Sequence, residues 1–171
     1  MATCATAALL GITVGTVHTL SVFADYFQFI VQDELSDDDF ANIWSDKASA
    51  AQTAFGRSAV CPGTLRNVTV PVDVVIVEAD PRLSLDTVDH AVEGSIELPS
   101  GRVVVMGCTD YFPDAPRLEV QPGTYHVLAV MTGIDSIKNE WEPADDRYIV
   151  YLWPGSARSP RLLKHWKRGA V

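Results

Sequence analysis

Two stretches, VEGSIELPSGRVVVM (residues 92–106) and LEVQPGTYHVLAVM (residues 118–131), decide the fold class. In each, apolar residues run or alternate on both sides of a short turn, Pro99-Ser100-Gly101 in the first and Gln121-Pro122-Gly123 in the second. Short β-type runs separated by such turns are typical of antiparallel hairpins. The sequence therefore predicts two hairpins and a β-rich fold.

Four further segments have the β-branched and aromatic content of strands. Residues 18–24 and 26–32 predict either two strands or one long strand with a kink at Asp25, and residues 68–78 and 148–153 predict two more. Strands at a spacing of roughly ten residues favour a sandwich over a parallel sheet. We therefore expect a mainly β protein, an antiparallel β-sandwich of about seven or eight strands with one short helix.

The expected helix covers the alanine-rich residues 45–55. Ser45 is a favourable N-cap, and Gly56 suits the position just after a helix end. A start at Ser36 stays open, because the carboxylates of residues 37–39 would then lie in the first turn, where the helix dipole favours them.

The length of 171 residues predicts one β-sandwich domain, residues 1–155, followed by a basic C-terminal tail, residues 156–171. No apolar run is long enough for a membrane span. The first Lys or Arg is Lys47, so the apolar start lacks the positive region of a secretory signal. The three cysteines are an odd number without a CxxC pair, which argues against a disulfide framework. We expect a cytoplasmic protein with reduced thiols.

Charge is distributed unevenly along the chain. The formal net charge is −9, and all 22 acidic residues lie between Asp25 and Asp146. The last 14 residues hold five of the 13 bases, so the rest of the chain, with eight bases, has a net charge of −14. Such a body should repel nucleic acid and membrane surfaces and attract a basic protein partner. Acidity that only keeps the protein soluble is the other reading.

The densest acidic run, residues 33–39, lacks the glycine and the ligand spacing of a calcium loop. It is either a solvated loop or part of an interface with a basic partner. The candidate partner-binding residues, all in predicted loops, are Asp33, Glu34, Asp37, Asp38, Asp39, Glu140, Glu142, Asp145 and Asp146.

Enzyme chemistry has weak support in the sequence. There is no GxSxG, GxGxxG, HxH or HExxH motif, so we expect no enzyme, no cofactor and no metal. Cys108, at the end of a predicted strand, could act as a nucleophile only with a base such as a histidine nearby. The loop aromatics Tyr111, Phe112 and Trp141 leave open a small-ligand or carbohydrate-binding protein.

Four short motifs carry a resemblance that spans most of residues 18–155. They are DYFQF (25–29), WSDKA (44–48), PGTY (122–125) and RYIV (147–150). In these motifs and their order the chain resembles the competence protein J family, small bacterial β-sandwich inhibitors of a DNA-entry nuclease. The resemblance implies a non-enzymatic, acidic protein-binding module that acts as an inhibitor or immunity-type protein of a basic enzyme such as a nuclease. A nuclease needs a basic surface to bind phosphates, which an acidic inhibitor could occupy.

Overall fold

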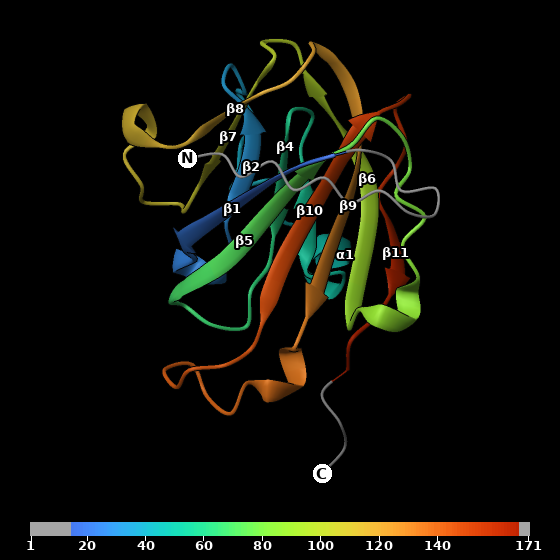
Figure 1. Ribbon diagram of the computed structural model, residues 1–171. Coiled ribbons are helices and arrows are strands. Elements are labelled where there is room, and N and C mark those ends of the chain that lie inside the picture. Colours follow the sequence, from blue (N-terminus) through green and yellow to red (C-terminus); the bar gives the residue numbers. More distant parts are fainter. Residues whose placement is uncertain (1–14, 168–171) are drawn as a thin grey trace.

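Two β-sheets packed face to face make up the computed structural model, which describes residues 15–167 (Figure 1). The six-stranded sheet has the order β1-β5-β10-β9-β6-β11, and the five-stranded sheet has the order β3-β4-β2-β7-β8. The strands are β1 (Thr16–Phe23), β2 (Ile30–Asp33), β3 (Thr53–Phe55), β4 (Ala59–Pro62), β5 (Thr69–Ile76), β6 (His90–Leu98), β7 (Arg102–Met106), β8 (Arg117–Glu119), β9 (Gly123–Thr132), β10 (Arg147–Pro154) and β11 (Arg161–Lys164). The helices are α1 (Asp46–Ala50) and the 3₁₀ turns η1 (Asp25–Phe27), η2 (Leu85–Thr87), η3 (Phe112–Asp114) and η4 (Ile134–Ser136). The predicted β-sandwich with one short helix is confirmed.

The described chain has more strands than the expected seven or eight. The additional ones are β3, β4 and β11, which have three or four residues each and are too short to produce a clear alternation in sequence. One pairing also departs from the antiparallel pattern, because β10 runs parallel to β5, with Tyr148 opposite Val72. The other pairings between these strands are antiparallel.

The prediction of two hairpins is wrong, although their strands and turns lie where expected. Pro99-Ser100-Gly101 joins β6 in one sheet to β7 in the other, and Gln121-Pro122-Gly123 joins β8 to β9 in the same way. β6 then pairs with β9, and β7 pairs with β8, so the two crossings stack on each other. Val103 and Val105 are buried in the core between the sheets, and Val104 is buried in a second cluster with Ile30 and Met106. A two-stranded hairpin cannot provide such cover.

Residues 18–32 form two strands and not one long kinked strand. β1 ends in the six-stranded sheet at Phe23, η1 follows, and β2 begins in the five-stranded sheet at Ile30. The segment between them is therefore a corner at which the chain changes sheets.

The helix prediction is correct at its start and wrong at its end. Ser45 is the N-cap, and its hydroxyl accepts a hydrogen bond from the Ala48 N–H at 3.2 Å. The helix ends at Ala50, and β3 follows, with Ala54 opposite Cys61 of β4. Gln52, with a positive φ of 52°, reverses the chain between them. The alternative start at Ser36 is also wrong, because residues 36–39 are not helical.

The core lies between the two sheets and explains why the apolar runs form these strands. Val72 and Val150 from the six-stranded sheet meet Val31 and Val103 from the five-stranded sheet in one buried cluster. The largest fully buried side chain is Tyr148. This core supplies a rigid body on which the corner at η1 and the loops are held.

The residues after β10 return to the six-stranded sheet. β11 pairs with β6, and both Arg158 and Arg161 form ion pairs with Glu93, at 2.9 and 2.8 Å. The basic residues in this part of the tail are thus held against the sheet. None of the helices within residues 15–167 combines the length and the apolar character needed to cross a membrane.

Candidate functional site

The corner at η1 has an unusual backbone. Tyr26 and Phe27 both have positive φ, 55° and 58°, a region that bulky side chains rarely adopt. Each such residue costs on the order of 1–3 kcal/mol, and such strain clusters at functional positions. Hydrogen bonds hold the conformation, from the Phe27 N–H to the Ala24 carbonyl at 3.2 Å and from the Thr64 N–H to the Phe27 carbonyl at 2.7 Å.

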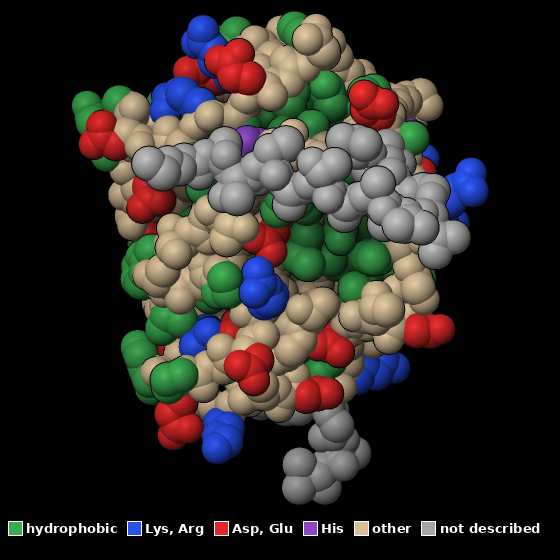
Figure 2. All heavy atoms as spheres, viewed as in Figure 1, with side chains coloured by type: hydrophobic (Ala, Val, Ile, Leu, Met, Phe, Trp, Pro, Cys, Tyr) green, Lys and Arg blue, Asp and Glu red, His purple; other side chains and the backbone are tan. Residues whose placement is uncertain are grey.

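The conformation turns aromatic side chains outward. Tyr26 is 72% exposed and Phe27 44% exposed, and Phe23 at the end of β1 is 45% exposed. Figure 2 shows hydrophobic side chains gathered along the left edge of the molecule, on the side where η1 lies in Figure 1. Clustered exposed aromatics of this kind mark interaction sites more often than isolated ones do.

Asp25 anchors the corner from within. Its carboxylate is buried, and Oδ1 accepts a hydrogen bond from the Cys108 N–H at 2.7 Å. Gly107 makes this approach possible, since a Cβ there would lie 2.2 Å from the Phe23 carbonyl oxygen. The turn after β7 is thereby fixed against η1.

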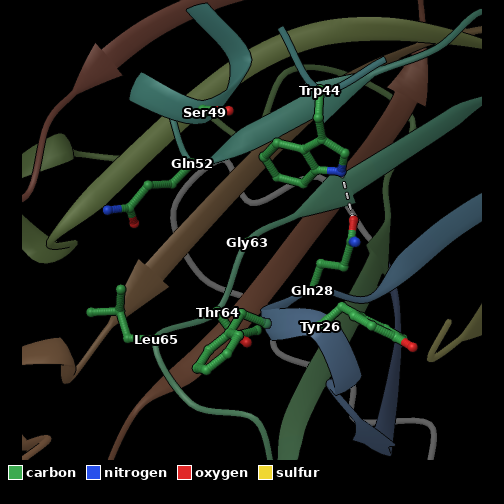
Figure 3. A pocket seen from close by; sticks show the side chains of 9 residues that line it. Tyr26, Gln28, Trp44, Ser49, Gln52, Gly63, Thr64 and Leu65 are labelled. Carbon is green, nitrogen blue, oxygen red and sulfur yellow. Dashed lines mark hydrogen bonds between the residues drawn. The ribbon is translucent and has the colours of Figure 1, made fainter. Parts of the chain in front are cut away.

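Two hollows flank the exposed aromatics. The first, of about 390 Å³, lies between η1, α1 and residues 63–65, and Trp44 and Gln28 line it. The Trp44 indole N–H donates to Gln28 Oε1 at 2.7 Å across this hollow (Figure 3). The second, of about 480 Å³, lies on the other side of Phe27 and is lined by Phe23, Asp25, Tyr26, Phe27, Asn67 and Thr109.

Residues 64–68 connect the corner to the loop between β9 and β10. The Ala24 N–H donates to the Val68 carbonyl at 3.0 Å, on the corner side. On the loop side, the buried Arg66 pairs with the Asp146 carboxylate and donates to the Glu142 carbonyl at 3.0 Å. The corner and this loop therefore occupy the same end of the sandwich, the lower left of Figure 1. We call residues 23–28, 64–68 and 133–146 together the η1 end.

The candidate acids of residues 33–39 lie at the opposite end, beside the Pro99-Ser100-Gly101 crossing. Asp33 is fully buried, and it accepts hydrogen bonds from the Leu35 N–H and from the Ser100 N–H and hydroxyl. Glu34 binds Arg117 and Arg102, and these two guanidinium groups lower the pKa of its carboxyl, Arg117 more strongly. These two acids stabilise the fold.

The other acids of this run differ in exposure. Asp38 accepts hydrogen bonds from the backbone N–H groups of Arg57 and Ser58, at 2.8 and 2.7 Å. Asp39 is exposed but accepts from the Ala41 N–H, and Asp37 is exposed. Asp37 and Asp39 are thus the exposed acids of this run, and both carboxylate oxygens of Asp39 accept hydrogen bonds, from the Ala41 N–H and from the Asn42 side-chain amide.

The remaining candidate acids belong to the η1 end. Asp146 is fully buried in its ion pair with Arg66 and also accepts the hydroxyl of Tyr148 at 2.9 Å. Glu142 and Asp145 are exposed, and Glu140 is half-buried. Next to them Trp141 is 74% exposed. The structure thus brings three accessible acids and an exposed tryptophan to the end that also carries the corner aromatics, and separates them from residues 33–39.

The surroundings of Cys108 do not activate its thiol. Burial, together with the nearby carboxylates of Asp25 and Asp110, raises the pKa of Cys108 to about 11. A cysteine nucleophile needs a lowered pKa and an adjacent base. Among residues 15–167, no group of three His, Cys, Asp or Glu side chains is arranged to hold a metal ion.

The loop aromatics that leave open a small-ligand or carbohydrate-binding protein do not form one surface. Tyr111 and Phe112 lie in the loop after β7, and Trp141 lies in the loop before β10; Figure 1 places these loops at different edges of the molecule. Phe112 is covered by the Arg117 guanidinium, 5.0 Å above its ring. These three residues together therefore do not form a single ligand site.

Comparison with known proteins gives matches among solved structures. The structure of ComJ from Bacillus subtilis, described as an inhibitor of the DNA degrading activity of NucA, superposes with a TM-score of 0.61, at 14% identity over 82% of this chain and 96% of that one. The chain has a ComJ-like fold. The structure of crocagin biosynthetic gene J superposes with a TM-score of 0.60, at 21% identity over 83% of this chain and 99% of that one. No protein-family model and no curated protein sequence matches the chain.

Sequence reasoning missed the corner as a surface feature. The DYFQF motif was prominent in the sequence, but alternate aromatics of a strand are expected to fill a core. Phe29 does so and is fully buried, whereas Tyr26 and Phe27 point outward because η1 interrupts the strand. The acidic Asp25 before two aromatics was the signal that a strand could end there.

Proposed function

We propose that this protein is a non-enzymatic inhibitor or immunity-type protein that binds a basic enzyme, such as a nuclease, through its η1 end. The observation that carries the proposal is the pairing of exposed aromatics with accessible acids at one end of a ComJ-like fold. Tyr and Trp are frequent at the centres of protein interfaces, and Tyr26 and Trp141 are exposed here.

Charge supports a basic partner. The net charge of −9 favours encounter with a cationic surface. Glu140, Glu142 and Asp145 would then form an acidic rim beside the apolar contacts. The inhibitor named in the ComJ structure acts on a DNA-degrading protein, and such a protein needs a basic surface for phosphates. The free thiols of Cys61 and Cys108 fit a cytoplasmic setting.

A capture experiment with charge variants tests the proposal. The immobilised protein is exposed to lysate of its source cell at low salt and eluted with a salt gradient, and eluted proteins are identified and assayed for nuclease activity. We expect a basic protein that elutes at modest salt and whose activity the added protein reduces. Neutralising the η1 end (Glu140→Gln, Glu142→Gln, Asp145→Asn) should abolish capture.

The opposite end provides the matched control. Asp37→Asn with Asp39→Asn removes two exposed acids there and should leave capture unchanged. Loss of capture in this control, with retention in the η1-end variant, would instead assign the interface to residues 33–39. Asp33 is unsuitable for such a test, because reversing the charge at this fully buried position would unfold the protein.

The small-ligand alternative is favoured by the two hollows beside η1. Their volumes fall within the range of about 300–1,000 Å³ typical of ligand pockets. Absence of any captured protein at all salt concentrations, together with thermal stabilisation by a small molecule, would support this function over inhibition.

A further inference from the structure

Two of the residues that line the hollow between Phe23, Phe27 and Thr109 have a buried side-chain oxygen without a hydrogen-bond partner. Asp25 is only 6% exposed; its Oδ1 is used by the Cys108 N–H, and its Oδ2 has no hydrogen-bond partner among the described residues. Asn67 Oδ1, also buried in the lining of this hollow, has no partner there either. Buried polar oxygens without partners are rare in native proteins, and each one needs an explanation.

The other residues that line the hollow are mainly aromatic. Phe23, Tyr26 and Phe27, which are between 44% and 72% exposed, line it together with Thr109. The positive φ values of Tyr26 and Phe27 hold these rings in place around the opening. A group that binds here must therefore pack against aromatic rings and end in several hydrogen-bond donors.

We infer that this hollow receives an arginine side chain of the protein partner. The inference rests on the proposed function, since it specifies how the η1 end would recognise a basic protein. An arginine carries only donors, so its guanidinium can satisfy both Asp25 Oδ2 and Asn67 Oδ1. Its methylene stem packs on aromatic rings, and its planar cation stacks on their faces.

Arginine fits this hollow better than lysine does. The two free acceptors belong to different residues on different segments, Asp25 on η1 and Asn67 before β5. The guanidinium holds its donors in a fixed fork that can reach two acceptors, whereas an ammonium acts as a compact point charge. The net charge of −9 adds a long-range attraction for any cationic group approaching this end.

A titration with a blocked amino acid tests the inference without the partner. The ¹⁵N-labelled full chain is titrated with N-acetyl-arginine methylamide and, separately, with N-acetyl-citrulline methylamide, which has the same shape but no charge. We expect saturable shifts of the backbone amides of residues 23–28, 67 and 107–109 with arginine only. Asp25→Asn should weaken this binding at least tenfold.

The variants separate recognition from folding. Asp25→Asn keeps an oxygen that can accept from the Cys108 N–H, and Asn67→Ala removes the second acceptor without touching that contact. Asp39→Asn, at the opposite end, is the matched control and should bind like wild type. Equal shifts with citrulline, no localised shifts up to the solubility limit, or unchanged binding by both Asp25→Asn and Asn67→Ala would each overturn the inference. So would tighter binding of free arginine than of the blocked form, because the occupant would then be the amino acid itself.

The outcome is distinguishable from that of the proposed function. Localised arginine binding in a protein that captures no basic protein would support the hollow and reject the inhibitor role. Capture of a basic enzyme with equal affinity by wild type and Asp25→Asn would support the inhibitor role and reject arginine recognition by this hollow.

Discussion

Asp146 has a structural role that its position in a polar, acidic loop does not reveal. It is fully buried, paired with Arg66 and bonded to the hydroxyl of Tyr148. Burial, reinforced by the Asp146 carboxylate, raises the pKa of Tyr148, so the phenol remains a donor to that carboxylate. This network ties residues 64–68 to the start of β10 and positions the η1 end.

Breaking this buried ion pair should destabilise the fold. Asp146→Ala is expected to lower the free energy of unfolding by about 3–5 kcal/mol, because it leaves the buried Arg66 guanidinium without its counter-ion. Urea denaturation followed by tryptophan fluorescence measures the change. The double variant Asp146→Ala with Arg66→Met should recover part of the loss, since no charge is then left unpaired. A loss below about 0.5 kcal/mol in the single variant would contradict the structural role.

Cys108 should behave as an unactivated thiol. With a pKa raised to about 11 by burial and by Asp25, its thiolate fraction at pH 7 is very small. Its alkylation rate by iodoacetamide, followed by mass spectrometry of the Cys108 peptide, should rise about tenfold per pH unit from pH 7 to pH 10. A rate that already levels off near pH 7 would contradict this expectation and revive a nucleophilic role.

The role of a single residue could be predicted from the sequence where its partners are close to it in the chain. The N-cap role of Ser45 depends on its own hydroxyl and the next three residues, so it was predictable. The burial of Asp33 and Asp146 depends on Ser100 and Arg66, which are 67 and 80 positions away. No local pattern contains those partners, and acids in loops are usually solvated.

At the scale of elements, the sequence predicts strands better than it predicts their pairing. Pro-Ser-Gly and Gln-Pro-Gly turns reverse the chain equally well within one sheet or between two. Which of these occurs depends on how the valines of residues 103–105 are buried, and their burial is determined by tertiary packing and not by the local sequence. Tertiary contacts also override local preference at β3. Its pairing with β4 prevails over the helical preference of the alanine-rich segment before it.

β11 is connected to the body by a histidine. His90, at the start of β6, is fully buried; its Nδ1 accepts from the Trp166 N–H at 3.1 Å, and its Nε2 lies 2.7 Å from the Ala51 carbonyl. The ring is therefore neutral, with its proton on Nε2. Burial lowers the pKa of His90 below its ordinary value, and the neighbouring His165 adds to this effect.

Protonation of His90 should weaken the fold in mild acid. Because the folded-state pKa is lowered, the unfolded chain binds more protons, so the stabilisation is complete above the unfolded value of about 6.5 and falls as pH decreases through it. Urea unfolding between pH 7.5 and 5 should show this decrease. It should be smaller in His90→Gln, whereas His18→Gln, a half-exposed position on β1, should keep the wild-type pH dependence. Equal pH dependence in wild type and His90→Gln would contradict the assignment.

At the scale of the whole molecule, composition and strand spacing were enough for the sandwich, and a net charge of −9 was enough to suggest a basic partner. They could not divide the acids between the two ends of the sandwich. That division arises because the run before Phe40 follows β2 at one end, whereas the acids around Trp141 precede β10 at the other. Position along the chain gives no indication of which end a loop occupies until the strand order is known.

The charge of the whole molecule and the aromatics of the η1 end should affect binding in different kinetic steps. If the partner is basic, long-range attraction accelerates encounter, and salt screens it over a Debye length of about 10 Å at 0.1 M. Raising NaCl from about 20 to 300 mM should therefore lower the association rate constant at least tenfold, with little change in dissociation, as measured by surface plasmon resonance on the captured partner. Trp141→Ala should do the reverse and accelerate dissociation, because its effect comes from short-range contacts. Salt-independent association would show that the acidity of the chain serves solubility, and it would leave the aromatic contacts as the basis of recognition.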